Sequence, residues 1–130
     1  NSVTSSSGSS AAPSSQRGQA IFTQDANLNI GAGAIRLRNL LNRTLTIQSV
    51  SCEVNTAPGG ASIVVDVNKN GVTIFTTQSN RPTIADGANF GTTAAIDIPQ
   101  WYSGDYLTMD IDQTGVSPVG SDLVVTVVYL

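Results

Sequence analysis

The chain has 130 residues, of which 40% are hydrophobic and 12% are charged, and its formal net charge at pH 7 is −3. This length suits one domain, because two separate cores would each be too small to be stable without disulfides or metals. The six basic residues are too few and too scattered to neutralise a phosphate backbone, so we expect no binding to nucleic acid. The absence of histidine excludes hydrolases built on a histidine base and most zinc enzymes.

No run of apolar residues is long enough to span a bilayer, and the first residues lack the basic and hydrophobic segments of a signal peptide, so we expect no membrane association. The chain begins with Asn1 and its only methionine is Met109, which indicates a processed chain or an excerpt. The single cysteine, Cys52, excludes an intrachain disulfide. Because Cys52 lies in an alternating apolar run, we expect a small buried residue rather than a reactive thiol or an interchain bridge.

Residues 1–18 form a serine-rich segment, with eight serines among the first fifteen residues. Such a composition cannot offset the entropy of ordering the chain. We therefore expect an extended N-terminal arm that becomes ordered where a neighbouring subunit or a different protein holds it. The alternative is that the arm folds back on its own domain. The residues expected to anchor it are Ser5, Ser9, Pro13, Gln16 and Arg17.

Residues 19–130 are expected to form one all-β domain. Short apolar runs alternate with Gly, Pro, Asn and Asp at intervals of about ten residues, which is typical of a sandwich or barrel. No segment has the pattern of an amphipathic helix. The spacing predicts an eight-stranded, antiparallel, jelly-roll-like β-sandwich with strands over 19–24, 34–41, 43–55, 61–69, 72–77, 89–98, 105–113 and 121–130.

Alternation within two of these segments indicates which side chains are buried. In 105–113 every second residue is apolar, which predicts one buried face and one face in contact with solvent. In 43–55 the apolar positions shift by one residue halfway along the segment. This shift predicts a bulge or bend near Gln48 and Ser49.

The last segment, 121–130, is apolar on both sides. A sandwich covers each sheet on one face only, so we expect the second face to pack against another subunit. The alternative is a central strand covered on both faces. The residues expected to make the subunit contacts are Val124, Val128 and Leu130.

Arg36 and Arg38 alternate with the apolar residues Ile35 and Leu37, which places two guanidinium groups on one outer face. They either bind acidic partners or are simply solvated, and solvation is the more common outcome.

Residues 66–71 match the first half of a calcium-binding loop. The match ends there, because Thr77 stands where a bidentate glutamate is needed and no helix flanks the segment. The same residues are typical of a β-hairpin with an Asn-Gly turn at 70–71, which would pair Val67 with Ile74 on the core side.

Four aspartates raise the possibility of a paired-carboxylate enzyme or a metal cluster. No His, Cys or Glu lies near them in sequence, and no basic residue is placed to position a substrate. We therefore expect a solvated strand surface, no catalytic residue, no metal site, no cofactor and no enzymatic activity. The four residues are Asp97, Asp105, Asp110 and Asp112.

Trp101 and Tyr102, with Asp105 close by, are candidates for a glycan contact, because sugar rings stack on aromatic faces and hydrogen-bond to carboxylates. The alternative, favoured for an isolated aromatic residue, is that Trp101 fills the end of the sandwich.

Four segments taken together resemble a β-sandwich module of virion proteins of tailed bacteriophages: APGGASIVVDVNKNG (57–71), RPTI (81–84), GDYLTMDIDQ (104–113) and GSDL (120–123). The resemblance spans residues 45–130 and leaves the arm unmatched. It implies a non-enzymatic module on capsid surfaces or tail fibres, commonly trimeric, and it carries over no catalytic or ligand residue. The GDYL segment also resembles strand entries in trimeric jelly rolls of the C1q and tumour-necrosis-factor type.

The function expected from these features is that of a capsid decoration or cement protein, located in the virion on the capsid surface. It would bind the major capsid protein through its arm, form a homotrimer, and stabilise the shell by adding buried area between capsomers. The alternative is a tail-fibre or spike module that recognises a host-surface glycan.

Overall fold

The computed structural model of the protein describes residues 17–130. Within them no helix is long and apolar enough to cross a membrane, and one 3-10 turn, η2, covers Gln78–Asn80. The rest of the regular structure consists of strands: β1 (Gly18–Asn27), β2 (Gly31–Ala32), β3 (Leu37–Arg38), β4 (Leu45–Thr56), β5 (Ile63–Lys69), β6 (Val72–Thr73), β7 (Thr83–Ile84), β8 (Phe90–Thr93), β9 (Gln100–Trp101), β10 (Tyr106–Gln113) and β11 (Ser121–Tyr129).

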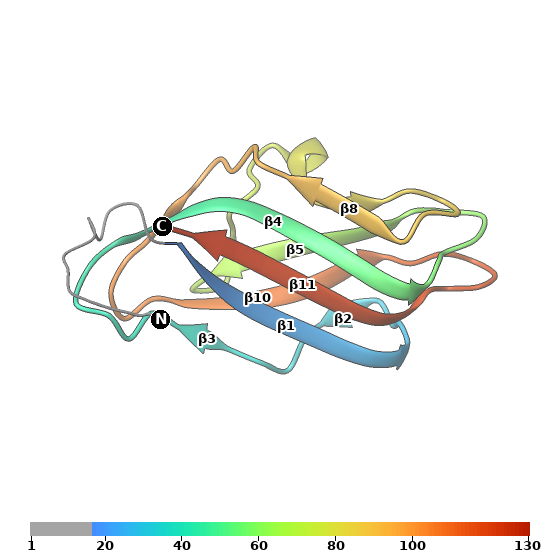
Figure 1. The fold of residues 1–130 in the computed structure, drawn as a ribbon, viewed down its shortest axis with the longest axis horizontal. Helices are drawn as coiled ribbons and strands as arrows, with labels where there is room; N and C mark the ends of the chain where they lie inside the picture. The colour runs from blue at the N-terminus through green and yellow to red at the C-terminus, as the bar shows by residue number, and fades with distance from the viewer. Residues whose placement is uncertain (1–16) are drawn as a thin grey trace.

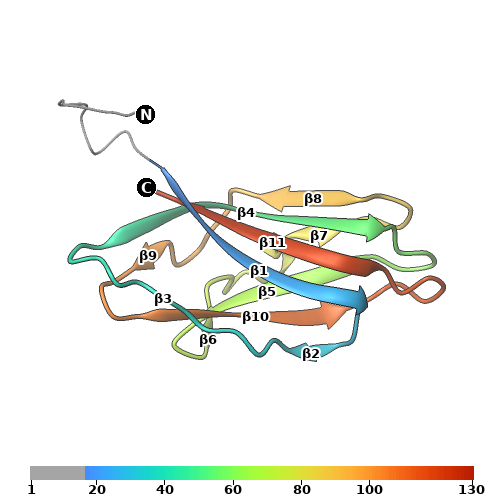
Figure 2. The same ribbon diagram turned by 60° about the horizontal axis from the view of Figure 1, so that its bottom comes forward.

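The strands form two antiparallel sheets that pack against each other (Figures 1 and 2). In the first, called sheet 1, the order is β1-β11-β4-β8, and β9 pairs with the first two residues of β4. In the second, called sheet 2, the order is β2-β10-β5-β6, with β3 also on β10 and β7 also on β5.

Three positions in the sandwich are occupied by pairs of short strands. β2 and β3 lie along β10, β6 and β7 lie along β5, and β8 and β9 lie along β4. Counting each pair once leaves four positions in each sheet, with the first strand beside the last, which is the arrangement of a jelly roll. The predicted all-β, jelly-roll-like sandwich is therefore confirmed, although the described residues contain more strands than predicted.

The expected bounds of the short strands were wrong. Within the strand expected over 34–41 the structure has β3 alone, and the segments β2, β7 and β9 were not expected at all. Each of these strands has two residues, which is too short to show alternation. They form because a long neighbouring strand offers backbone hydrogen bonds, and that pairing depends on distant parts of the chain.

The core lies between the sheets and follows the alternation of the long strands. On β10 the side chains of Leu107, Met109 and Ile111 are buried, whereas the residues between them are at least partly exposed. The predicted solvent face of this strand is confirmed. The other buried apolar residues are Phe22, Leu28, Leu45, Ile47, Val50, Cys52, Val54, Ile63, Val65, Val67, Ile74, Phe75, Ile84, Trp101, Leu123, Val125 and Val127.

A bulge in β4 shifts the register of sheet 1. Val128 pairs with Ser49, and the next residue, Tyr129, pairs with Ile47, so Gln48 has no partner on β11. The extra residue lets both Ile47 and Val50 point into the core. The bulge predicted near Gln48 and Ser49 is confirmed.

The predicted hairpin between β5 and β6 is also confirmed. Asn70 and Gly71 have φ values of 52° and 87°, the left-handed conformations that a tight two-residue turn requires. The backbone N–H of Ile74 donates to the carbonyl oxygen of Val67 at 3.0 Å, and both side chains are buried.

β1 begins at Gly18, which pairs with Tyr129 near the end of β11. Arg17, the last of the expected anchor residues, is exposed directly before this strand. The other expected anchor residues, Ser5, Ser9, Pro13 and Gln16, lie outside the described residues.

Candidate functional site

The outer face of sheet 1 is the surface of β1, β11, β4 and β8 that points away from sheet 2. Cross-strand partners in an antiparallel sheet point to the same side, so the register identifies the residues of this face. They lie in three rows across the strands: Gln19, Val128 and Ser49; Ile21, Thr126, Ser51 and Thr92; Thr23, Val124, Glu53 and Phe90.

Within these three rows the outer face is apolar or weakly polar, and the exposed acids Asp25 and Asp122 lie beyond the rows, near the end of β1 and the start of β11. Ile21 is 49% exposed, Val124 36% and Phe90 52%. Glu53 is the one charged residue in the three rows, and the remaining polar groups are small hydroxyls and amides. The hydroxyls of Ser51 and Thr92 hydrogen-bond to each other at 2.9 Å, so fewer of their hydrogen bonds have to be made to water. Such a surface can be covered by a partner at little desolvation cost.

The three residues expected to make subunit contacts lie on this outer face. Val124 and Val128 belong to two of its rows. Leu130 follows at the end of β11, where it exchanges both backbone hydrogen bonds with Thr46, at 3.0 and 2.9 Å. Sequence reasoning missed Ile21 and Phe90, which join this face only through the strand order.

β1 forms one edge of sheet 1. It pairs with β11 on one side, and within residues 17–130 no strand pairs with its other side. An open strand edge offers unpaired N–H and C=O groups to a partner chain. The serine-rich segment expected to anchor the protein therefore joins the domain at an open edge, beside the outer face.

Trp101 lies inside one end of the sandwich. It is 3% exposed, and its indole packs edge-on against the ring of Tyr129, with centroids 5.6 Å apart and planes at 87°. A ring that is buried in this way has no face for a sugar. The position of Trp101 therefore fits the alternative interpretation, in which the residue fills the end of the sandwich.

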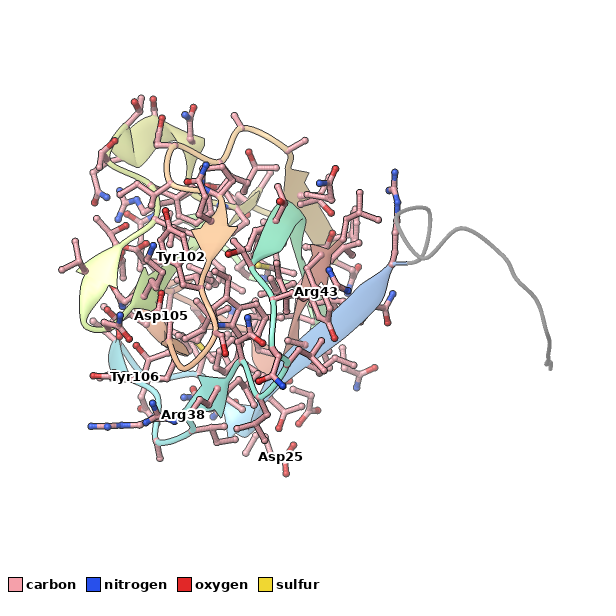
Figure 3. All side chains as sticks on the ribbon, turned by 90° about the vertical axis from the view of Figure 1, so that its left-hand side faces the viewer. Asp25, Arg38, Arg43, Tyr102, Asp105 and Tyr106 are labelled. Carbon is pink, nitrogen blue, oxygen red and sulfur yellow. The ribbon has the colours of Figure 1, made fainter. Side chains whose placement is uncertain are left out.

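The other two residues of the expected glycan contact lie on the surface at the same end (Figure 3). Tyr102 is 51% exposed. Asp105 shapes the turn: its carboxylate accepts a hydrogen bond from the backbone N–H of Tyr102 at 3.2 Å and another from the Asn70 side chain at 2.9 Å. Asp105 is thus already engaged in holding the turn that presents Tyr102.

Basic side chains flank this turn. The guanidinium groups of Arg36 and Arg38 lie over the ring of Tyr106, 4.4 and 5.4 Å from its centroid. The ammonium group of Lys69 lies 4.9 Å from the centroid of the Tyr102 ring. We call these five residues the cation–aromatic row.

The remaining aspartates are dispersed and engaged in separate interactions. Asp97 accepts a hydrogen bond from the backbone N–H of Thr77 at 2.9 Å. Asp112 forms an ion pair with Arg81 at 2.7 Å. Asp110 accepts a hydrogen bond from the Asn68 amide at 2.8 Å.

Asp66, which sequence reasoning did not single out as a titratable residue, lies directly opposite Asp110 across β5 and β10. It is 6% exposed, and burial raises the pKa of its carboxyl above the ordinary value. A hydrogen bond from the Thr73 hydroxyl, 2.6 Å from Asp66 Oδ1, opposes that rise. Asp66 lies between the buried Val65 and Val67, so alternation places it on the opposite face of the strand and gives no signal of its burial.

The polar side chains of the calcium-like segment do not converge on one point. Asp66 interacts with Thr73, Asn68 with Asp110 and Asn70 with Asp105. Within the described residues, no group of three or more His, Cys, Asp or Glu side chains is arranged to hold a metal ion. These side chains therefore form hydrogen bonds within the hairpin and to the segments beside it.

Cys52 is buried in the core, as expected. Burial raises the pKa of its thiol to about 12, because the thiolate would lie in an apolar environment.

No protein-family model matches the chain, and no curated protein of similar sequence is found. Among solved structures, a chain of the cyanophage Pam1 capsid asymmetric unit is similar to this one, with 12% sequence identity and a TM-score of 0.44. The alignment covers 88% of this chain and 82% of that chain.

Proposed function

We propose that the protein is a non-enzymatic structural protein of a bacteriophage virion, a capsid decoration protein that works as a homotrimer. The outer face of sheet 1 makes the contact between subunits, and the serine-rich segment preceding β1 anchors each subunit on the major capsid protein. The observation that carries the proposal is the partly apolar outer face, which has one charged residue in its three rows, together with the start of β1 at its edge, where that segment joins the domain beside the end of β11.

The exposed apolar side chains of this face, Ile21, Val124 and Phe90, favour association over a free monomer, because a partner removes them from water. Contacts between copies also multiply on a capsid, since each subunit is held at several points and weak contacts together give tight retention. This is how a small protein would stabilise a shell without chemistry of its own.

Native mass spectrometry of the purified chain and of Val124→Lys tests the subunit contact. Val124 is exposed on the outer face of sheet 1, and a lysine there would bring a charge into the contact. Val116→Lys is the matched control, because Val116 is 71% exposed in the loop before β11 and outside the three rows. We expect a trimer for the wild type and the control and a monomer for Val124→Lys. A wild-type monomer would contradict the proposal.

Sedimentation with purified phage capsids tests the anchor. The full chain should sediment with the shells, whereas a chain lacking residues 1–17 should stay in solution. Ending the deletion at residue 17 leaves β1 whole, and Gly18 keeps its pairing with Tyr129. Equal retention of the two chains would exclude the segment as the anchor.

The second candidate is a fibre or spike module that recognises a host-surface glycan. The exposed ring of Tyr102 favours it, and the burial of Trp101 removes one of its expected contacts. Binding to a glycan array that Tyr102→Ala abolishes, together with no binding to capsids, would support this candidate over the first.

A further inference from the structure

Three of the six basic residues of the chain, Arg36, Arg38 and Lys69, gather at one end of the sandwich. Figure 3 shows this end, with Tyr102, Asp105, Tyr106 and Arg38 following one another across it. The chain as a whole carries a net charge of −3, so this end differs in sign from the average of the protein. The proposed structural role uses none of these side chains.

The turn at 102–105 connects the two parts of the cation–aromatic row, the arginines over Tyr106 and Lys69 over Tyr102. Arg38 lies over Tyr106 and also donates a hydrogen bond to the carbonyl oxygen of Gly104. The neighbouring residue, Asp105, holds the backbone N–H of Tyr102 at 3.2 Å. Lys69 lies over the ring of Tyr102 and donates to the carbonyl oxygen of Gln100 at 2.8 Å.

The cations of this row have no carboxylate partner in the described part of the chain. There, the ion pair between Arg81 and Asp112 is the one within 4.0 Å, and it lies at the other end of β10. Asp105 is the nearest acid along the row, and its two oxygens already accept hydrogen bonds from Asn70 and Tyr102.

This arrangement suits a carboxylate carried on a sugar ring. A guanidinium group over an aromatic ring keeps N–H groups at its edge, and those of Arg36, with those of Arg38 that do not donate to Gly104, match the two oxygens of a carboxylate. The stacking also limits the side chain's freedom before the ligand arrives, which lowers the entropic cost of binding. The exposed ring of Tyr102 offers an apolar face of the size of one sugar ring.

We propose that the cation–aromatic row is a binding site for an acidic polysaccharide, a chain of sugars that carry carboxylates. Arg36 and Arg38 bind the carboxylate of one sugar, Tyr102 stacks on another, and Lys69 adds charge beside it. A polysaccharide is favoured over an acidic peptide because the row pairs its cations with an exposed ring. A failure of this proposal would leave the capsid role untouched, since the two use different surfaces.

Titration calorimetry of the full chain tests the site, with polygalacturonate as the acidic probe and dextran as the neutral one. We expect binding to polygalacturonate that weakens as salt rises, and no binding to dextran. The double variant Arg36→Ala/Arg38→Ala should lose at least about tenfold in affinity, because it removes the charge-assisted hydrogen bonds to the carboxylate.

Arg81→Ala is the control for the single variants Arg36→Ala and Arg38→Ala, since each removes one positive charge and Arg81 lies at a distance from the row. All these substitutions concern surface side chains, and circular dichroism establishes that each variant is folded. A loss for Arg81→Ala as large as for either single variant would overturn the proposal, because it would show attraction by net charge alone.

Two further outcomes decide between ligands. Tyr102→Ala should weaken binding to polygalacturonate several-fold and leave binding to poly-glutamate unchanged. Equal affinity for the two polymers with no effect of Tyr102→Ala would identify an acidic-peptide site and overturn the polysaccharide proposal. Absence of binding to polygalacturonate at low salt would overturn it directly.

Discussion

The indole N–H of Trp101 donates a hydrogen bond to the backbone carbonyl oxygen of Asp105 at 2.9 Å, so a buried side chain holds the base of the turn that carries Tyr102. The core of the sandwich and the surface at this end are thereby linked through one residue. The bond explains how a turn of polar residues keeps a defined shape beside the cation–aromatic row.

Trp101→Phe should lower the free energy of unfolding by about 1 kcal/mol from the lost hydrogen bond, and Trp101→Ala by about 3–5 kcal/mol from the cavity as well. Urea unfolding followed by circular dichroism measures both, since Trp101 is the only tryptophan and fluorescence is lost with it. The control, Tyr102→Phe, changes an exposed side chain and should shift stability by less than about 0.5 kcal/mol. An equal effect of Tyr102→Phe and Trp101→Ala would contradict the assignment of Trp101 to the core.

Gly91 is required where β8 passes β7. A Cβ atom added at Gly91 would lie 1.9 Å from the carbonyl oxygen of Thr83, so the backbone of one strand would have to move. We expect Gly91→Ala to destabilise the protein by about 1–3 kcal/mol, the usual cost of forcing extra atoms into a packed site. Thermal unfolding measures this, with Val72→Ala, at an exposed strand position, as control. A melting temperature above that of the control would exclude the close approach.

Cys52 should not react with a thiol reagent while the protein is folded. Its pKa of about 12 leaves a thiolate fraction of about one in ten thousand at pH 8, and the side chain is also inaccessible. Ellman's reagent at pH 8 should label one thiol per chain in 6 M guanidinium chloride and none in buffer over the same period. Rapid labelling in buffer would show that this part of the core opens.

Asp66 should make the protein less stable at neutral pH than at acidic pH. Burial raises the pKa of the folded-state carboxyl, so the folded protein keeps this proton to a higher pH than the unfolded chain does. The unfolded state therefore gains stability relative to the folded state as the pH rises through the interval between the two pKa values. Below that interval both states are protonated, and this destabilising contribution disappears.

Asp66→Asn should raise the melting temperature at pH 7 and have little effect below the ordinary pKa of aspartate, because the amide is neutral and its oxygen still accepts the Thr73 hydroxyl. Thermal unfolding between pH 3 and pH 7 measures the difference. Asp86→Asn, at an exposed aspartate, is the control for the loss of one negative charge. A variant that is less stable than the wild type at pH 7 would contradict the prediction.

Much of the fold follows from local alternation. The buried face of β10, the bulge at Gln48 and the tight turn at Asn70 all depend on residues that are neighbours in sequence, and all three are found in the structure. Part of the outer face was predictable for the same reason, since Val124 and Val128 alternate with buried residues in one strand.

The rest of the outer face was not predictable. Ile21 and Phe90 join Val124 only because β1, β11, β4 and β8 are neighbours in that order. The cation–aromatic row has the same origin: Arg36 and Lys69 are far apart in sequence from the turn that brings them together. Composition and spacing contain no information on such neighbours.

The sequence by itself determined the all-β class, the place of the long strands and the side of each that is buried, because a strand's faces repeat every two residues and apolar side chains leave water. Only the tertiary structure decided which strands are neighbours, where the two-residue strands form, and which charges lie together. Those features depend on backbone pairing and packing between segments distant in sequence, so no local pattern encodes them.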